Sequence, residues 1–345
     1  MPKTVVINGL LLASKLRGMG VYLKNILENS QHAPVSVVVP QKELHSNPKQ
    51  KTKPSLFKMN AQIFEQLYFP LMSFLIRPNY TVHSGNSCSL IPCAGKEILL
   101  IHDVSYLKDS SIVPRSDSLK RKLGKVYRSL TIRAGINRAH KIVTVSEFAK
   151  DDIVRELGAN VDKIIVVPNA INPLFFSNTD NIDFVSRDYD LLFVTGTDRQ
   201  KNLLNTLNFI SKTPVLAQLK TAVVGVAESE ISTDFPNVTF LGYLENEALK
   251  EVYSQSKIFC MPSFYESFAI PALEGYACGC NLVLSQQGAP KSIFGDRAAY
   301  FDPSDFAGLE QAIQHSLSRQ MTVDLEMMRE FTWTNSAKKF DELFD

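Results

Sequence analysis

The sequence is poor in cysteine and has no long apolar run, and each absence excludes a class of protein. Its 345 residues hold five cysteines at irregular spacing, too few for a disulfide-stapled scaffold. The Cys278-x-Cys280 pair has no second cluster of ligands beside it, so no metal is expected. No stretch of 18 uncharged apolar residues occurs, which excludes an obvious transmembrane helix. Asn8 and Gly9 interrupt the apolar N-terminal stretch, which indicates a first strand rather than a signal peptide. We therefore expect a cytoplasmic protein.

The apolar content and the length of the chain suffice for two domains with hydrophobic cores. Apolar residues make up 45% of the chain and charged residues 21%, and the length fits about two domains of ~100–200 residues. Short β-branched runs alternate with helical patterns, which predicts βαβ units and parallel sheets. The expected strands are 4–8, 35–40, 97–103, 141–146 and 163–170, then 190–196, 220–225, 237–242, 257–263 and 281–285.

The restart of this pattern near residues 175–190 predicts an α/β architecture of two doubly wound, Rossmann-like parallel sheets facing across a cleft. We place the N-terminal domain at 1–172 and the C-terminal domain at 173–330. A closing helix at 331–345 is expected to pack back on the N-terminal domain.

Charge is distributed unevenly between the halves. Residues 1–175 hold 24 Lys and Arg against 12 Asp and Glu, whereas residues 176–345 hold 13 against 23. Basic residues concentrate in Lys42 to Lys58 and Lys108 to Lys141. Each stretch is either a solvated face or a surface for an anionic partner, such as a membrane or a nucleic acid. A nucleic acid is the less favoured partner, because few aromatic side chains interleave with the basic ones.

Two helical segments leave the membrane question open. Segment 56–77 is apolar and aromatic, and we favour a core helix broken at Pro70 over a helix whose exposed face touches lipid. Segment 115–139 carries an apolar stripe at helical spacing, with basic residues over much of the rest. We expect that stripe to pack on its own sheet, with membrane contact through the charges. The stripe consists of Leu119, Leu123, Val126, Leu130 and Ala134.

Residues 257–290 carry the densest chemical signal. A strand is expected to end near Ser263, and a helix to begin near Pro271, since proline suits a first helical turn. The amides of Phe268 to Ile270 would then lie at a helix N-terminus, which favours an anion. Glu274, one turn inside the helix, is suited to accept from a ribose diol, and Glu266 from the hydroxyls of a sugar. Taken singly, the two glutamates are more often a loop charge and a helix-start charge.

Ordered motifs along the chain support the functional interpretation. They are RGMGVY (17–22), IHDVSYL (101–107), KIVTVSEFAKDDI (141–153), VPNAIN (167–172), GTDRQKN (196–202), PSFYESFAIPALEGYACGC (262–280) and FTWTNSAKKF (331–340). Together they resemble the retaining glycosyltransferases of the GT-B fold, family GT4 (glycosyl transferases group 1). The family's two glutamates with seven residues between them correspond to Glu266 and Glu274.

The resemblance implies four catalytic residues. Lys201 and Arg199 match the basic pair that neutralises the departing diphosphate, a role in which a fixed cation stabilises the transition state. Glu266 matches the residue that contacts the donor-sugar hydroxyls, and His102 a histidine near the reacting centre. The spacing from Gly196 to Lys201 is one residue shorter than usual, which favours Lys201 over Arg199 as the phosphate ligand.

The resemblance also implies a nucleotide-sugar site without a metal. Its residues are Gly18, Gly20, Gly196, Phe268, Ala269, Ile270 and Glu274. Ala269 stands where the family usually has glycine, and its methyl would narrow the loop.

The implied activity is retaining transfer of a hexosyl group (mannosyl, glucosyl or rhamnosyl type) from a nucleotide-diphosphate sugar to a saccharide, in bacterial surface polysaccharide assembly. No cofactor is implied, and the acceptor is expected to be an oligosaccharide or a lipid-linked saccharide. The enzyme would be cytoplasmic, with peripheral contact at the anionic inner face of the cell membrane. The alternatives are a nucleotide-sugar epimerase of the same fold and a non-catalytic partner protein. A nicotinamide dehydrogenase is disfavoured, because no G-x-G-x-x-G follows a strand.

Overall fold

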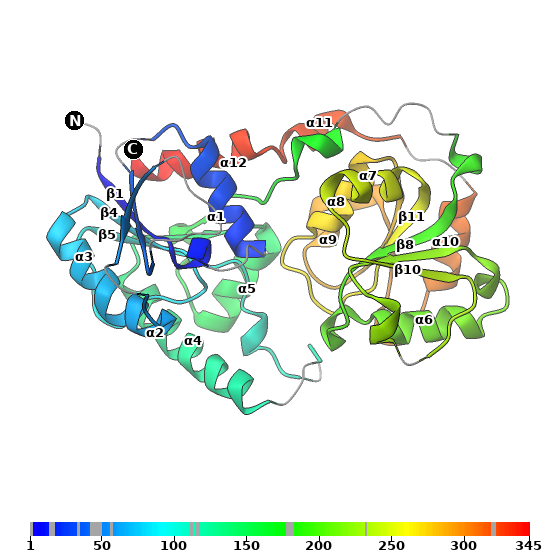
Figure 1. Cartoon of the computed structure of the whole chain (residues 1–345), viewed down its shortest axis with the longest axis horizontal. Helices are drawn as coiled ribbons and strands as arrows, with labels where there is room; N and C mark the ends of the chain where they lie inside the picture. The colour runs from blue at the N-terminus through cyan, green and yellow to red at the C-terminus, as the bar shows by residue number, and fades with distance from the viewer. Residues whose placement is uncertain are drawn as a thin grey trace. The chain divides into compact units, whose positions relative to one another are not determined.

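The chain forms two compact units in a computed structural model (Figure 1). The structure describes residues 3–13, 18–32, 35–41, 50–55, 58–110, 113–114, 118–176, 183–231, 233–318 and 322–345, apart from the side chains of residues 120 and 121. Unit 1 comprises Met1–Lys108, Asp117–Ala170 and Phe331–Asp345, and unit 2 comprises Asp109–Ser116 and Ile171–Glu330. Residue 17, the first of the RGMGVY motif, and residues 42–49 of the basic Lys42 to Lys58 stretch lie outside the described residues.

Unit 1 is built on a seven-stranded sheet of order β3-β2-β1-β4-β5-β6-β7, in which every pairing is parallel. Its strands are β1 (Val5–Asn8), β2 (Val35–Val39), β3 (Lys51–Pro54), β4 (Tyr80–His83), β5 (Lys96–Leu100), β6 (Lys141–Thr144) and β7 (Ile164–Val166). Its helices are α1 (Gly18–Asn29), α2 (Ala61–Ile63), α3 (Phe69–Ile76), α4 (Leu119–Arg138), α5 (Glu147–Leu157) and α12 (Trp333–Asp341). Buried aliphatic side chains of α4 and α5 pack on β5, β6 and β7.

The last helix of the chain belongs to unit 1. Thr332 caps the first turn of α12 by accepting from the amide of Asn335. Trp333 meets the ring of Tyr22 on α1 at 6.0 Å between centroids. Asp341 ties the other end to the chain after α1, because its carboxylate accepts from the Ser30 hydroxyl at 2.5 Å and from the backbone amides of the next two residues.

Unit 2 is built on a six-stranded parallel sheet of order β10-β9-β8-β11-β12-β13. Its strands are β8 (Tyr189–Val194), β9 (Thr221–Val224), β10 (Val238–Gly242), β11 (Ser256–Met261), β12 (Asn281–Ser285) and β13 (Ala299–Phe301). Its helices are α6 (Leu203–Lys212), α7 (Asn246–Ser254), α8 (Ile270–Ala277), α9 (Pro290–Phe294), α10 (Leu309–Leu317) and α11 (Leu325–Arg329).

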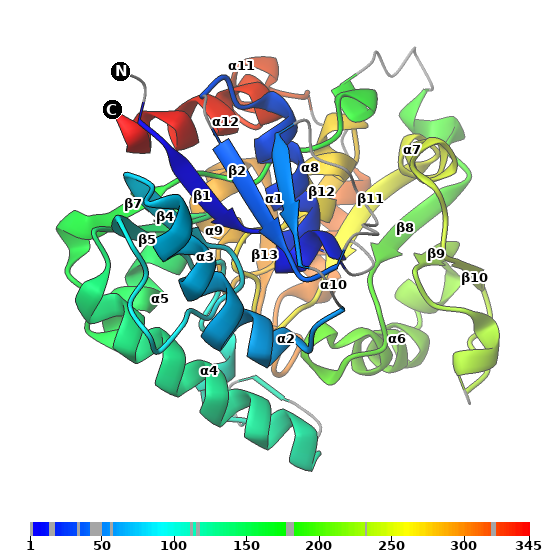
Figure 2. The same ribbon diagram turned by 60° about the vertical axis from the view of Figure 1, so that its left-hand side comes forward.

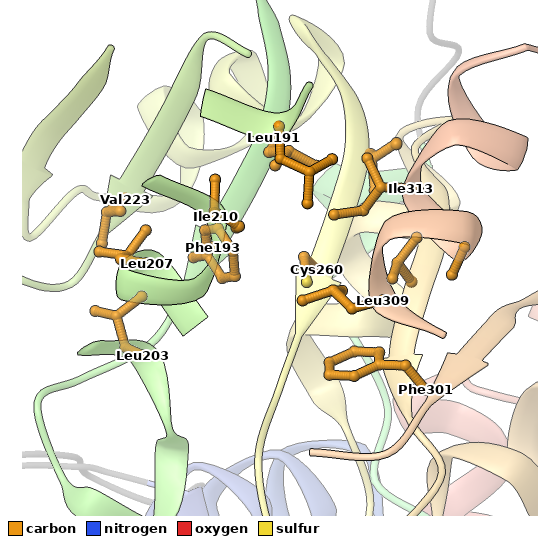
Figure 3. Packing of buried hydrophobic residues seen from close by; sticks show 14 of the residues in the cluster. Leu191, Phe193, Leu203, Leu207, Ile210, Val223, Cys260, Phe301, Leu309 and Ile313 are labelled. Carbon is orange, nitrogen blue, oxygen red and sulfur yellow. The ribbon is translucent and has the colours of Figure 1, made fainter. Parts of the chain in front are cut away.

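The two faces of this sheet receive different helices. Ile258 and Cys260 on β11 belong to the core formed with α6 and α10 (Figure 3). Phe259 points the opposite way, as alternation along a strand requires. On that face Phe259 lies close to Gly275 of α8. A Cβ added to Gly275 would lie only 3.1 Å from the Cβ of Phe259. The absent side chain therefore lets α8 sit directly on the sheet, which fixes the helix that begins at the predicted site.

The fold confirms the two parallel-sheet α/β architecture, and a strand lies within or across each of the ten expected ranges. Two of them are shorter than expected, because the range 163–170 holds only Ile164–Val166 and the range 97–103 ends as a strand at Leu100. Three further strands, β3, β4 and β13, were not expected. β3 is the edge strand of its sheet and lies inside the basic Lys42 to Lys58 stretch. Lysine is a common residue on an exposed edge, because it discourages pairing with other chains.

Two expectations about helices were wrong. Residues 61–76 are helical throughout, with a π-helical turn at Phe64–Tyr68, and Pro70 stands in the first turn of α3 instead of breaking the helix. The stripe of α4 does not pack on the sheet: Leu119, Leu123, Val126 and Leu130 are 55–73% exposed. The buried side of α4 is instead made by residues such as Ile132 and Ile136.

All five cysteines are buried and unpaired. Burial raises the pKa of the thiols of Cys88, Cys93 and Cys278 to about 12, and it raises the pKa of the other two further. Among helices in the described ranges, none combines the length and the apolar composition that a membrane crossing requires.

Candidate active site

Two neighbouring strands of unit 2, β8 and β11, lead to predicted site residues beyond their carboxyl ends. β8 leads to Gly196 and to the 3-10 turn Arg199–Lys201, and β11 leads to Glu266 and the start of α8. The sheet order reverses between β8 and β11, since β9 and β10 lie on one side and β12 and β13 on the other. Ligands of doubly wound sheets bind at such a switch point.

Lys201 and Glu266 form an ion pair across this switch point. The Lys201 Nζ lies 2.7 Å from the Glu266 Oε1, and the two side chains are 36% and 16% exposed. The backbone holds both loops together, because the Phe264 amide donates to the Gln200 carbonyl at 2.9 Å and the Gln200 side chain donates to the Tyr265 carbonyl at 3.1 Å. The geometry therefore presents one cation and one carboxylate from different strands to the same point.

Asn202 fixes the end of the Arg199–Lys201 turn. It has a φ of 58°, a left-handed conformation that asparagine tolerates better than most residues. Its side-chain amide donates to the Pro303 carbonyl at 2.8 Å. Arg199 itself is exposed. A cavity of about 420 Å³ adjoins the turn and is lined by residues 197–199 and 202–205 together with Pro114 and Phe264.

The start of α8 has the form expected for an anion site. Ala269 is the N-cap residue, Ile270 begins the helix, and Pro271 stands in its first turn. Within the part of the chain that the structure describes, the amides of Ala269 and Ile270 donate to no protein acceptor. Ala269 has a φ of 108°, a region that favours glycine, and it is 4% exposed. The strained alanine therefore keeps the backbone turn for which glycine is the usual residue. Phe268 is buried beside it.

Glu274 lies one turn into α8 and is partly buried. Burial raises the pKa of its carboxyl to about 7, and a hydrogen bond from the Tyr253 hydroxyl to Oε2 at 3.2 Å opposes that rise. The carboxyl is thus half protonated near neutral pH in the protein without ligand. A ligand that donates hydrogen bonds here would favour the ionised form.

Gly288, beyond β12, is a site residue that the sequence analysis missed. It has a φ of +96°, and a Cβ at this position would lie 2.6 Å from the Glu266 carbonyl oxygen. The amide of Ala289 also donates to that carbonyl at 2.8 Å. The loop after β12, the neighbour of β11, therefore supports the backbone of Glu266.

Unit 1 places His102 two residues beyond the carboxyl end of β5, the end of the strand at which it was predicted. The side chain is buried, which lowers its pKa to about 4, so the imidazole is neutral at physiological pH. Its ring meets the edge of Tyr22 at 4.6 Å between centroids. Tyr22 follows the predicted glycines on α1: Gly18 is exposed, and Gly20 is buried in the first turn of the helix.

Asn86, after β4, holds the loop of His102 and was also missed. Its Oδ1 accepts from the His102 amide at 2.6 Å, and its Nδ2 donates to the Asp103 carboxylate at 3.2 Å. Its own amide donates to the Leu100 carbonyl at 3.3 Å, and its φ is 53°. Asn86 is thus a positioning residue that fixes the backbone on which His102 stands.

A buried group in unit 1 has residue types that bind metals. His83, Cys93 and Glu97 each offer one possible ligand atom, and these three atoms lie within 4.8 Å of one another. Glu97 already pairs with Arg138 at 3.1 Å and with His83 at 3.0 Å. Burial alone would raise the pKa of Glu97, but hydrogen bonds from His83 and Arg138 hold that pKa below its usual value. The group is therefore accounted for as a buried ion-pair network.

The predicted site residues thus fall into two sets. Unit 2 brings Lys201, Glu266, Gly196, Arg199 and the start of α8 to one end of its sheet. Unit 1 brings the start of α1 and the loop of His102 together. Each set lies at the carboxyl ends of parallel strands within its own unit.

Comparison with known proteins agrees with this geometry. Residues 179–332 match the family model "Glycosyl transferases group 1", and residues 80–174 match "Glycosyltransferase Family 4". The O-antigen chain mannosyltransferase B of Escherichia coli is 23% identical over 264 residues, which cover 70% of this chain and 68% of that protein.

Solved structures share the whole fold. The apo form of the lipopolysaccharide outer core galactosyltransferase WaaB superposes with a TM-score of 0.68 at 13% identity, covering 99% of this chain and 98% of that one. Anabaena HepE in complex with UDP and glucose superposes with a TM-score of 0.61 at 11% identity, covering 100% and 95%. The two family models, in collinear order over both units, show that the chain belongs to the glycosyltransferases of the GT-B fold, family GT4.

Proposed function

We propose that the chain transfers a hexosyl group, with retention of configuration, from a nucleotide-diphosphate sugar to a saccharide acceptor in the assembly of a bacterial surface polysaccharide. The observation that carries the proposal is the Lys201–Glu266 pair beside the start of α8. It provides a cation for a diphosphate and a carboxylate for sugar hydroxyls at one point. The mannosyltransferase named above supports the hexosyl class.

The chain's own residues account for donor binding in unit 2. The free amides at the start of α8 and the Lys201 ammonium would hold the diphosphate, with Arg199 adding charge from the exposed side of its turn. Glu266 would orient the sugar by accepting from its hydroxyls, and Glu274 would accept from the ribose. We propose that these cations supply the positive charge that a divalent metal supplies in other transferases, and that no cofactor is needed.

In the proposed reaction, the bond between the anomeric carbon and the diphosphate oxygen breaks while a bond forms from the acceptor oxygen to the same carbon. Retention requires that the acceptor approach from the side of the leaving group. The departing phosphate oxygen then takes the acceptor proton. Lys201 stabilises the negative charge that develops on the diphosphate, which is where a fixed cation acts most strongly.

We assign the acceptor to unit 1, in which the neutral imidazole of His102 would donate to or accept from sugar oxygens. The basic composition of this half fits an acceptor with phosphate groups, such as a lipid-linked saccharide. We further propose that the enzyme works in the cytoplasm, peripherally at the anionic inner face of the membrane.

A donor screen followed by product analysis tests the proposal. Thermal shift with UDP-, GDP- and dTDP-sugars identifies the nucleotide, and proton NMR of the first product gives its anomeric configuration. An inverted product, or a rate abolished by EDTA and restored by a divalent metal, would contradict the retaining, metal-independent mechanism. Release of nucleoside diphosphate without any acceptor would instead favour the epimerase alternative, which the family's named transferases do not favour.

A further inference from the structure

Two helical segments of unit 1 expose apolar side chains where helices of a water-facing surface usually carry polar ones. In the helical segment 61–76, the exposed positions from residue 63 onward recur every three or four residues and are all large and apolar. They are Ile63, Leu67, Leu71, Phe74 and Leu75, each 53–69% exposed. On α4 the outward stripe is equally apolar, as described above.

The two segments lie side by side, as Figures 1 and 2 show. The Tyr127 hydroxyl of α4 donates to the Glu65 Oε2 at 2.5 Å, and the side-chain Nε2 of Gln66 donates to the same hydroxyl at 2.8 Å. Leu90 and Ile91, 52% and 43% exposed, lie in the adjoining loop, where the Leu90 amide donates to the Gln66 side chain at 2.8 Å. We call these exposed side chains of 61–76, 90–91 and α4 the apolar face.

Positive charge accompanies the apolar face. Residues 118–138 contain seven Lys and Arg and no Asp or Glu. Lys122, Lys125 and Arg133 are exposed on α4. The one acid of segment 61–76, Glu65, is 3% exposed and is held by Tyr127 and by the Ser87 hydroxyl. No exposed carboxylate of these two helices therefore opposes an anionic partner.

We propose that the apolar face inserts into the headgroup region of an anionic lipid bilayer. Large apolar side chains bordered by lysine and arginine are the pattern of helices that lie in a membrane interface. A second copy of this chain is the less suitable occupant, because a twofold contact would bring the basic α4 helices of both copies together. The biological role of this membrane contact rests on the proposed function, in which the acceptor is linked to a membrane lipid. Lipid binding itself is measured without turnover.

Co-sedimentation tests the inference with vesicles of phosphatidylglycerol and phosphatidylcholine, against vesicles of phosphatidylcholine alone. The full chain should pellet with the anionic vesicles and release at high salt. Leu71→Glu with Leu123→Glu should weaken binding by about tenfold or more, since each buried leucine contributes to insertion. Lys122→Glu with Lys125→Glu should weaken binding to anionic vesicles and should have little effect on neutral ones.

The matched control is Val161→Glu with Val185→Glu, at exposed apolar positions outside the apolar face (48% and 77% exposed). This control should bind like the unaltered chain. Unchanged lipid binding by the leucine double variant, with its circular-dichroism melting curve intact, would overturn the inference. So would light scattering that shows a dimer of the unaltered chain and a monomer of that variant.

Transfer to a water-soluble acceptor separates this inference from the proposed function. The leucine double variant should keep that activity while it loses lipid binding. If the unaltered chain binds lipid but transfers no sugar, the membrane surface stands and the proposed function fails. If it transfers sugar and does not bind anionic vesicles, the reverse holds.

Discussion

The raised pKa of Glu274 leads to a quantitative prediction about nucleotide binding. Glu274 is partly buried on α8, and desolvation raises the pKa of its carboxyl to about 7, so about half of the molecules carry a proton on it at neutral pH. A ribose diol donates hydrogen bonds and needs the ionised carboxylate as acceptor. Binding of a nucleotide sugar should therefore expel the proton.

The expected stoichiometry follows from that pKa. If only the ionised form binds, about 0.9 proton should be released per nucleotide sugar at pH 6, about 0.5 at pH 7 and about 0.1 at pH 8. The sign is fixed, because the bound state has the lower pKa and so holds fewer protons. The apparent affinity should fall roughly tenfold from pH 8 to pH 6.

Titration calorimetry in buffers of different ionisation enthalpy measures this release directly. A nucleotide sugar is the ligand of choice, because its diphosphate is esterified at both ends and does not itself titrate near neutrality. Glu274→Gln is the control, since it keeps the shape of the side chain and cannot ionise; its binding should be weaker and should release none of this proton. Equal proton release and equal affinity in the two proteins would refute the ribose role of Glu274.

Three further predictions concern the supports of the site. Lys201→Ala should lower kcat by about 10²–10³ on the true donor, the usual scale for the loss of one transition-state charge stabiliser, and full turnover would show that its role is misassigned. Gly288→Ala should lower both the melting temperature and kcat/KM, because its Cβ would meet the Glu266 backbone. Gly295→Ala is its matched control: Gly295 is also at positive φ but has open space around it, so this variant should lower the melting temperature without affecting kcat/KM. Asn86→Ala should lower kcat while the donor affinity measured by calorimetry is unchanged, because it loosens the loop after β5 in the other unit; a loss of donor affinity would contradict that division.

Much of the fold follows from periodicity in the sequence. Runs such as 35–39 (VSVVV) are short, rich in β-branched residues and flanked by prolines, and these features are typical of a buried parallel strand. β3 was not predicted because its sequence, KTKP, has no apolar pattern, and β13 was not predicted because it has only three residues. Both are edge strands, for which burial constrains the sequence least.

The exposed side of α4 could not be read from its pattern. The helix has two sides that a sequence can mistake for its core: the leucine stripe and a second side with Ile132, Gly135 and Ile136. A Cβ on Gly135 would lie 2.3 Å from the Cys88 Sγ, so the glycine marks the side that approaches the protein most closely. Only the packing shows that the smaller residues face inward.

The acidic and basic site residues could be predicted because each stands in a sequence motif and the motifs follow a recognisable order along the chain. Gly288 and Asn86 stand outside those motifs, and their contacts with Glu266 and with the loop of His102 follow from the order of the strands in the fold. Asn86 follows β4, a strand that was not expected, so its place next to the loop of His102 had no signal. Gly288 follows the expected strand 281–285, and a glycine after such a strand is the one signal that was available.

The burial of all five thiols has a practical consequence. A cysteine introduced at an exposed position of either unit would react with an alkylating spin label or fluorophore far faster than the native thiols, which are both shielded and protonated. With one such label on each unit, distances between the units could be measured without first replacing the native cysteines. Whether sugar-nucleotide binding draws them together then becomes a direct spectroscopic measurement.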